Sequence, residues 1–563
     1  ELVFYPLFDI IFLLLIYPDQ QWGVERGKDI YSHCIERSYQ CEENYYSVNV
    51  GPKMEMLLIT FTCLSVLIVY QIIKKINNYY SWREKINRIP GPSGRFPIIG
   101  LSWDIIKVKR EDRLRWFHSM ANQYKNGIYR TWIGFDPTIH INTPENAEII
   151  FRSTTFIEKS VFYDSMVPWL GQGLVTSSGD KWFRDRKLIT PAFHFGILDD
   201  FAEVMVEKVA ILNERLKEQV ELHGNKSFDV FDIIGKCSLD IICETAMGVN
   251  VDAQSKNENE YSRAVEELSM QAVNRMVRPW LKFDWIYYRT EMGKKFRAAI
   301  EITQTRCTHV IEQKKIERQQ KVKTDCQDVD EGIGKAKRRA FLDLLLESSA
   351  NAVKPWTIEE IREQVDTFMF AGHDTTGALI SWALFCLGND EKVQNSIHQE
   401  LHEVFGNSSE PVTTKQIPQL KYLDRVIKEV LRMFPSVAVV SRRISEDFQM
   451  GRHIIPSGCT VMMQIYQLHR DPRHWPNPSH FDPDRFLPEN SKGRHPFSYV
   501  PFSGGIRNCI GQRFAIMEIK IVLTEILRKW RVKSRDNHEN IKKYNALILR
   551  PHEGIFLNLY PRI

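Results

Sequence analysis

This sequence has no CxxC pair and no closely spaced framework of cysteines. Small secreted domains that depend on disulfide bonds carry cysteines at much higher density. A disulfide-stabilised fold is therefore excluded, and we expect the body of the chain to be reduced and cytosolic. The ten cysteines are scattered along 563 residues, at Cys34, Cys41, Cys63, Cys237, Cys243, Cys307, Cys326, Cys386, Cys459 and Cys509.

Clustered basic charge is also missing. The chain has 75 basic and 70 acidic residues, which leaves a formal net charge of only +5. Domains that bind nucleic acid gather Lys and Arg on one face, so we expect no nucleic-acid partner. We find no internal repeat, and no point after residue 100 has the composition of a domain boundary. With 43% hydrophobic residues, the chain has ample material for one large core.

Long apolar runs without charge are scarce, and the clearest extends from Met56 to Ile73. It is just long enough to cross a bilayer as a helix, which needs about 20 residues. Lys74 and Lys75 follow at once, and basic flanks favour the cytosolic side. A buried core helix is the alternative, and the lack of a small-x-small site disfavours a cleaved signal peptide. We predict a transmembrane anchor at 54–75, a basic and Pro/Gly-rich hinge at 76–99 and a cytosolic domain at 100–563.

The stretch before this run combines an interrupted apolar segment with a polar one. Leu2–Ile16 is apolar, but a proline and an aspartate interrupt it, and 17–53 is polar without a clear period. The first methionine is Met54. We expect residues 1–53 to be upstream sequence outside the mature protein, with a weak second membrane segment as the alternative.

Helical periodicity dominates after residue 100, with apolar residues recurring every three to four positions. It is clearest in Phe201–Val220, Ile358–Leu387, Lys415–Met433 and Gln512–Lys529. Strand-like runs occur at Ile128–Ile133, Thr138–Ile141 and Thr460–Ile465, and the charged stretch Gln313–Arg339 is expected to be an exposed connection. The sequence therefore predicts a mainly α (α+β) fold, in which one large helical domain with small β-sheets follows a transmembrane helix.

The segment Pro501–Gly511 (PFSGGIRNCIG) is the most informative part of the chain. Glycines flank Cys509 and permit the close approach of a flat cofactor. A helical pattern begins at Gln512, and a helix N-terminus stabilises a thiolate and lowers its pKa. A thiolate on haem iron favours O–O cleavage, and Arg507 is placed to neutralise a haem propionate. The complete FxxGxRxCxG pattern disfavours the alternative, a buried free cysteine beside a tight turn.

This pattern resembles the haem-binding signature of the cytochrome P-450 superfamily, and the resemblance extends over residues 90–560. It implies that family's helical fold, haem b (iron protoporphyrin IX) as cofactor, Cys509 as the axial ligand of the iron, and monooxygenase activity. The matching residues are Phe502, Gly505, Arg507, Cys509 and Gly511.

Glu429 and Arg432 lie three residues apart, which places them on one helix face. Most such pairs lie on the surface and contribute little to stability. The resemblance instead implies a buried network of these two residues with Arg485, from the segment Phe481–Phe486. Such a network would hold the cysteine loop in place near the proximal haem face and would do no chemistry.

The longest predicted helix begins with a capping-box pattern at Thr357–Glu360. Glycines and threonines near its middle weaken a helix and invite a kink, and a packing glycine is the alternative explanation. The resemblance implies that Gly372 opens a groove for dioxygen, and that Asp374 and Thr375 form an acid–alcohol pair that relays protons. We expect His373 to be packed or hydrogen-bonded rather than a ligand.

Trp182 and Arg186 lie four residues apart and share a helix face. This spacing alone is a weak signal. The resemblance implies that the indole N–H and the guanidinium meet the haem propionates.

Three runs resemble the family-4 branch of fatty-acid hydroxylases, including arthropod members that are linked to xenobiotics and hormones. They are Val365–Thr376, Thr190–Phe195 and Pro435–Val437. The resemblance implies a lipophilic substrate, which could be a fatty acid, a hormone-like lipid or a xenobiotic. In that branch a glutamate that forms an ester with haem usually occupies the position of Ala371, so we expect haem that is not covalently attached.

The resemblance also implies electrons from NADPH through the FAD and FMN of NADPH–cytochrome P-450 reductase, with a cytochrome b-type protein as a further donor. It implies the endoplasmic reticulum membrane, with the catalytic domain on the cytosolic face. A peroxide-rearranging enzyme and a non-catalytic haem carrier or sensor remain alternatives, which the acid–alcohol pair disfavours. Candidates for a basic docking face are Lys492, Arg494, Arg507 and Arg513, with ordinary solvated surface charge as the favoured explanation for any one of them.

Overall fold

The computed structural model describes residues 52–92, 99–124, 126–193, 195–255, 260–325, 340–351 and 356–562. Nearly all of the segment 1–53 lies outside this range, so what we predict for it stays a prediction.

The predicted mainly helical fold with small sheets is confirmed. The helices are α3 (Pro52–Asn87), α4 (Ser102–Lys107), α5 (Arg113–Asn122), α6 (Pro144–Arg152), α7 (Val167–Leu170), α8 (Gly179–Ile189), α9 (Phe195–His223), α10 (Phe231–Ile242), α11 (Glu260–Met276), α12 (Asp284–Tyr287), α13 (Glu291–Asp325), α14 (Phe341–Asn351), α15 (Ile358–Asn389), α16 (Glu391–Phe405), α17 (Lys421–Met433), α18 (Ile465–Leu468), α19 (Pro488–Ser491) and α20 (Gln512–Lys529). The strands are β1 (Ile128–Ile133), β2 (Asp136–Ile141), β3 (Phe228–Asp229), β4 (Val440–Arg443), β5 (Phe448–Met450), β6 (His453–Ile455), β7 (Thr460–Met463), β8 (Trp530–Ser534), β9 (Lys543–Asn545), β10 (Leu549–Pro551) and β11 (Phe556–Pro561).

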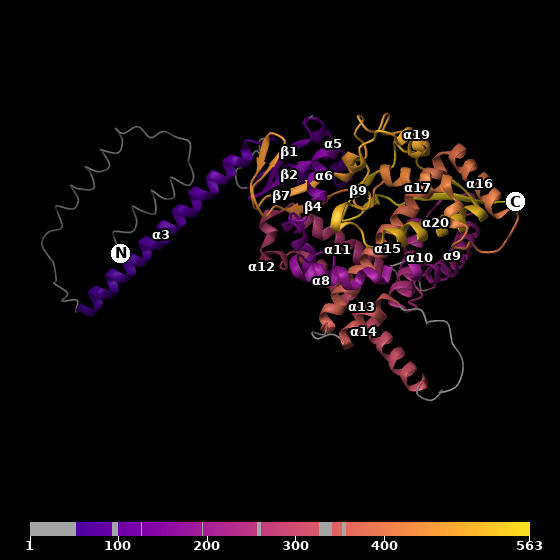
Figure 1. The fold of residues 1–563 in the computed structure, drawn as a ribbon, viewed down its shortest axis with the longest axis horizontal. Helices are drawn as coiled ribbons and strands as arrows, with labels where there is room; N and C mark the ends of the chain where they lie inside the picture. Colours follow the sequence, from indigo (N-terminus) through magenta and orange to yellow (C-terminus); the bar gives the residue numbers. More distant parts are fainter. Residues whose placement is uncertain are drawn as a thin grey trace. The chain divides into compact units, whose positions relative to one another are not determined.

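Helix α15 packs against α10, α17 and α20 in the middle of the helical domain (Figure 1). Its predicted capping box is present: Glu360 N–H donates to Thr357 Oγ1 at 3.1 Å, and Thr357 N–H donates to Glu360 Oε2 at 3.0 Å. Gly372 and Gly377 do not break the helix. Both glycines face α10, where the missing Cβ allows the two helices to approach closely.

The main sheet has the strand order β1-β2-β7-β4. β1 and β2 form an antiparallel hairpin with Ile128 opposite Ile141, and β2 runs parallel to β7 with Thr138 beside Thr460. Strand β1 has its predicted bounds, whereas β7 ends at Met463 because the chain turns into α18.

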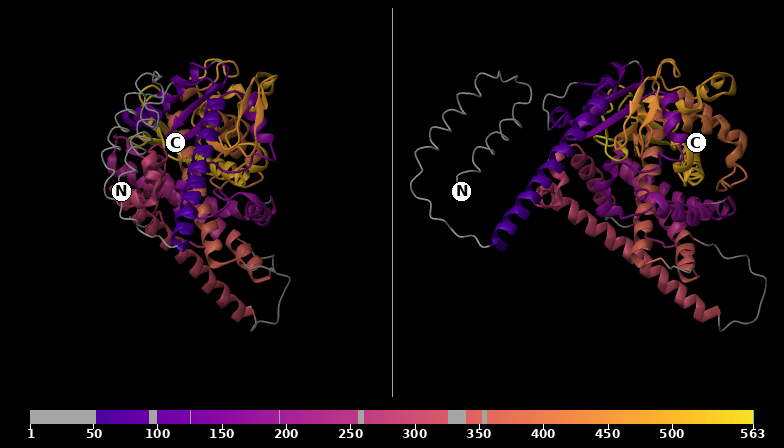
Figure 2. Two further views of the ribbon diagram at one scale, coloured as in Figure 1. Left: turned by 90° about the vertical axis from the view of Figure 1, so that its left-hand side faces the viewer. Right: turned by 60° about the vertical axis from the view of Figure 1, so that its left-hand side comes forward.

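Two other segments differ from prediction. Helix α17 begins at Lys421 rather than Lys415, since Pro418 has no N–H to continue a helix and Ile417–Gln419 forms a separate 3₁₀ turn. The charged stretch 313–339 is helical up to Asp325, at the end of α13, so this part is not an exposed connection. Lys, Glu and Gln are good helix formers. In Figure 2 the end of α13 projects beyond the neighbouring helices.

Helix α3 carries the apolar run expected to cross a membrane. Among the described residues it is the one helix long and apolar enough to do so, and none of its apolar window is buried. This exposure argues against a buried core helix. The helix continues to Asn87, so the first part of the expected hinge at 76–99 is helical. Near its end, Trp82 donates to Ser457 O at 2.8 Å, and Ile86 is buried beside the main sheet.

Candidate functional site

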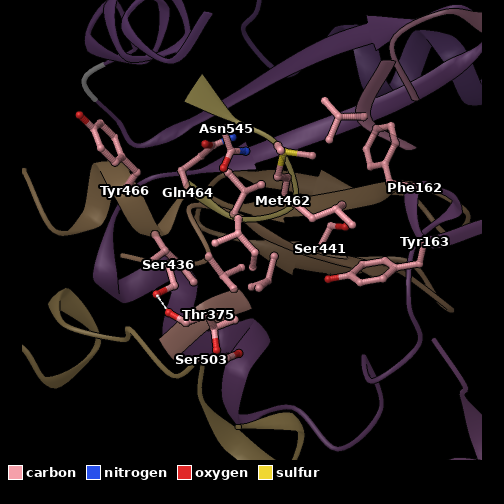
Figure 3. A pocket seen from close by; sticks show the side chains of 18 of the residues that line it. Phe162, Tyr163, Thr375, Ser436, Ser441, Met462, Gln464, Tyr466, Ser503 and Asn545 are labelled. Atoms are coloured by element: carbon pink, nitrogen blue, oxygen red, sulfur yellow. Dashed lines mark hydrogen bonds between the residues drawn. The ribbon is translucent and has the colours of Figure 1, made fainter. Parts of the chain in front are cut away.

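A cavity of about 430 Å³ lies beside the middle of α15. Its walls come from α5, α15, β4, β7, the cysteine loop and the segment 545–548. Figure 3 shows Thr375 and Ser503 at one end of the drawn side chains, with Gln464 and Asn545 at the other. Most of the lining side chains are apolar, so the cavity suits a lipophilic molecule.

The cysteine loop has a fixed backbone. Cys509 N–H donates to Phe502 O at 2.9 Å, and both residues line the cavity. Gly505 adopts φ +67°, and a Cβ there would collide with the carbonyl oxygen of Phe151. This position therefore requires glycine, and the loop delivers Cys509 to the cavity wall just before α20 begins.

The pKa of the Cys509 thiol is set by opposing effects. Its side chain is enclosed by protein but remains accessible from the cavity. Burial raises its pKa, and a hydrogen bond from the Gly511 backbone and the charge of Arg186 offset this only in part. The helix N-terminus therefore lowers this pKa through Gly511, as expected, but burial outweighs its effect. A cation bound to the sulfur would supply the missing positive charge.

Three cations line the cavity near this loop: Lys159, Arg442 and Arg507. None lies within ion-pair distance of a carboxylate in the described part of the chain. Burial first, then the charge of Arg442, lowers the pKa of Arg507 to about 9. Burial, followed by both arginines, lowers the pKa of Lys159 well below its usual value.

Arg507 Nη2 donates to Ser177 O at 2.9 Å, whereas its Nη1 is buried without a partner. Buried cations need anions, and the two haem propionates would supply them. The residues present therefore fit haem. Sequence reasoning missed Lys159 and Arg442, because they come from a loop and a strand with no motif of their own.

Trp182 and Arg186 lie on α8 next to the loop. The Arg507 guanidinium lies 4.4 Å from the centre of the Trp182 ring. Arg186 donates to Asn508 O and Asn508 Oδ1, both at 2.9 Å. Both α8 residues thus contact the loop around the cysteine. The Arg186 guanidinium already donates to Asn508 of this loop, so a haem propionate is not its first acceptor.

The central residues of α15 face different surroundings. Ala371 and Thr375 line the cavity, and Thr375 Oγ1 donates to Ala371 O at 2.8 Å. A Cβ at Gly372 would meet Ile242 of α10, and Gly372 is not part of the cavity wall. The structure thus supports a packing role for this glycine more than a dioxygen groove. His373 Nδ1 donates to Met369 O at 2.7 Å, and burial lowers its pKa, as expected for a packed histidine.

Asp374 points away from this cavity. It forms a buried ion pair with Arg550 of β10 and lines a second, polar cavity of about 250 Å³. Arg550 lies far along the chain, and sequence reasoning did not find it.

A buried carboxyl group on α20 was also missed. Glu518 Oε1 accepts from Ser238 at 2.6 Å and from Thr376 at 3.0 Å, while its Oε2 has no partner in the described residues. Burial raises the pKa of Glu518 to about 8. Three helices, α10, α15 and α20, therefore meet at one carboxyl group that is neutral at pH 7.

The expected charge network is present. Arg432 donates to Glu429 through Nε at 2.7 Å and through Nη2 at 2.8 Å, and neither side chain is exposed. Arg485 Nε lies 3.4 Å from Glu429 Oε1. Arg432 Nη1 also donates to Pro478 O at 2.8 Å. The network ties α17 to the segment that leads into the cysteine loop.

A cysteine that opens into an apolar cavity, beside buried cations that lack anions, defines the site of a haem-thiolate protein. Sequence comparison agrees. The profile of the family described as Cytochrome P450 matches residues 90–559, and the chain belongs to this family. It is a cytochrome P450 monooxygenase.

Its relatives include family-4 members from mammals and insects. Cytochrome P450 4V2 of Mus musculus is 42% identical over 498 residues, which cover 88% of this chain and 94% of the relative. Cytochrome P450 4c3 of Drosophila melanogaster is 41% identical over 489 residues, with 85% and 90% covered. Cytochrome P450 4c21 of Blattella germanica is 37% identical over 508 residues, with 90% and 100% covered.

Proposed function

We propose that this monooxygenase inserts one oxygen atom of O₂ into a lipophilic acid of the fatty-acid class, using electrons from NADPH through NADPH–cytochrome P-450 reductase. The observation that carries this is one apolar cavity that Cys509, Thr375 and three cations all line, none of the three being ion-paired among the described residues. Haem, when bound there, supplies dioxygen activation. Cys509 would bind its iron through the sulfur, and Arg507, Arg442 and Lys159 would neutralise its propionates.

The proton supply would come from α15. The Thr375 hydroxyl faces the cavity and holds a proton at the site. Asp374 lies on the polar side of the helix, where water can reach it. Transfer between them needs either a water bridge or rotation of Asp374 away from Arg550, because the two side chains do not contact each other directly. A cavity-facing hydroxyl favours oxygen insertion over peroxide rearrangement or haem transport.

Replacing the cysteine tests the ligand assignment. The reduced full-length protein with carbon monoxide should absorb at about 450 nm, as expected for haem iron bound by a thiolate. Cys509→His should abolish this band while the protein still binds haem. Persistence of the band in the variant would disprove the assignment. With reductase, NADPH and lauric acid, hydroxylated product should form. No product from lauric acid, together with NADPH-independent conversion of a lipid hydroperoxide, would instead favour the peroxide-rearranging alternative.

For the redox partner, we expect docking on the surface near the cysteine loop. Arg507 takes no part in it, since its guanidinium faces the cavity and Trp182. Arg494 is half-buried over Trp475 at 4.1 Å. Lys492 and Arg513 are exposed and remain the better candidates.

For localisation, we propose the endoplasmic reticulum membrane, with the catalytic domain on the cytosolic side. The exposed apolar run in α3 and the lysines that follow it support this. Deleting residues 1–75 should release a domain that still binds haem. Exposed aromatic residues in the segment 280–285 should leave some membrane affinity. Resistance of the truncated chain to alkaline carbonate extraction would reveal another integral segment.

A further inference from the structure

Arg113, the first residue of α5, also lines the apolar cavity, and the haem fit does not use it. Its charged neighbours differ from those of the haem-side cations. Burial first, and then the charges of Arg278 and Arg110, lowers the pKa of Arg113. Lys159, Arg442 and Arg507 instead influence one another. Arg113 and its neighbours Arg278 and Arg110, which do not themselves line the cavity, thus form a second group of positive charge, separate from the haem-side cations.

The second group lies at the end remote from the cysteine loop. α5 and the short turn before it, Arg110–Asp112, pack against β9. Arg110 lies 3.8 Å from the centre of the Tyr544 ring of that strand. Asn545, the next residue of β9, lies at the opposite end of the drawn cavity wall from Thr375 and Ser503 (Figure 3). Arg113 therefore belongs to the end where Asn545 lies.

Arg113 has hydrogen-bonding capacity to spare. Its Nε donates to Val108 O at 3.3 Å, and among the described residues no carboxylate lies within ion-pair distance of it. The Arg278 guanidinium donates, among the described residues, to Asn274 alone, through Nη1. Asn545 Oδ1 is buried and has no hydrogen-bond partner in the part of the chain that the structure describes. Gathering half-buried like charges without an anion is unfavourable, so this end of the cavity is suited to an anionic ligand group.

We propose that Arg113 binds the carboxylate of a lipophilic acid, supported by the positive charge of Arg110 and Arg278. This inference rests on the proposed function and specifies how the substrate lies. An acid held by Arg113 extends its chain along the apolar wall toward Thr375. Oxidation then falls on the part of the chain remote from the carboxylate. Asn545 can turn its amide NH₂ toward the same carboxylate.

The test compares an acid with its neutral ester. Full-length haem-loaded protein in lipid nanodiscs is titrated with lauric acid and with methyl laurate by calorimetry, and the oxidised carbon is identified by mass spectrometry after turnover with reductase. The variants are Arg113→Gln and Arg113→Lys. The control is Arg115→Gln, because Arg115 is exposed on the same helix and does not line the cavity.

Arg113→Gln should weaken lauric acid binding by about 10- to 100-fold, the loss expected for a charge-assisted hydrogen bond. Binding of methyl laurate should change by less than about twofold. In Arg113→Gln, oxidation of lauric acid should occur at more positions along its chain than in wild type. Arg113→Lys should retain part of the preference for the acid over the ester. Arg115→Gln should match wild type in both measurements.

Two results would overturn this inference but not the proposed function. One is that Arg113→Gln weakens the binding of acid and ester equally, which indicates a structural role. The other is that it weakens the binding of neither, while the wild-type protein oxidises both. A wild-type protein that oxidises neither compound refutes the proposed function, and the inference with it.

Discussion

Asp374 and Thr375 are neighbours in sequence, but their side chains line two different cavities beside α15. Thr375 lines the apolar cavity, whereas Asp374 forms an ion pair with Arg550 beside the polar cavity. Adjacent residues on a helix point about 100° apart. Helix α15 therefore places the carboxylate of Asp374 beside the polar cavity and the hydroxyl of Thr375 beside the apolar cavity. A proton relay between the two residues would therefore need a bridging water or a rotation of Asp374 away from Arg550.

Thr375→Ala should keep haem and substrate binding but lower product formed per NADPH by roughly tenfold or more, with a matching rise in hydrogen peroxide. The reason is that the cavity loses the hydroxyl that holds a proton at the site. Thr375→Ser keeps the hydroxyl and should stay close to wild type. Unchanged coupling in the alanine variant would remove Thr375 from the relay. Asp374→Asn is a poorer test, because it also leaves Arg550 buried without its anion.

The haem should be removable by acid and organic solvent. Ala371 lines the cavity, and its methyl group cannot form an ester. Asp374, the nearest acidic residue along the helix, faces the other side. Ala371→Glu should show partial attachment after turnover. Intact-mass measurement decides both points, and haem mass retained on the unmodified chain would mean that another residue makes a link.

Glu429→Ala should lower the free energy of unfolding by about 3–5 kcal/mol, because it leaves Arg432 and Arg485 buried without their carboxylate. Lys428→Ala on the same helix is the matched control. Its ion pair with Asp424 spans 2.8 Å, but the Lys428 side chain is 44% exposed, so the loss should stay below about 1 kcal/mol. Urea denaturation measures both. Similar losses for the two variants would show that burial of the network does not matter.

Glu518 should make the protein less stable as pH rises. Burial raises its pKa from 4.5 to about 8, so between these values the unfolded chain releases a proton that the folded chain retains. Folding is therefore penalised increasingly from about pH 4.5 and fully above about pH 8. Glu518→Gln keeps an oxygen acceptor for Ser238 and Thr376, but its amide does not titrate, so its stability does not fall with pH for this reason.

The Gln variant should gain stability relative to wild type between pH 5 and pH 8, as measured by urea midpoints across that range. Glu403→Gln, at an exposed position, should show no such trend. A constant difference between Glu518→Gln and wild type at all pH values would contradict the assignment of a neutral buried carboxyl group.

The sequence by itself determined the features that depend on short spacings. The capping box of α15, the Glu429–Arg432 pair and the glycine pattern around Cys509 could be recognised because each is set by neighbouring residues in one helix or loop. Helix α20 likewise has its predicted bounds. The apolar run of α3 was visible for the same reason, since a membrane span depends on local composition alone.

Only the tertiary structure decided which side chains share a cavity. Lys159, Arg442 and Arg113 come from three distant elements, and no local pattern marks any of them. Gly372 could have opened the cavity or packed a helix, and the position of Ile242 on α10 favours packing. Asp374 and Thr375 could be read as a pair from their adjacency, but the strand that carries Arg550 decides where the acid points. The physical reason is that burial and charge balance arise from contacts between elements far apart in sequence.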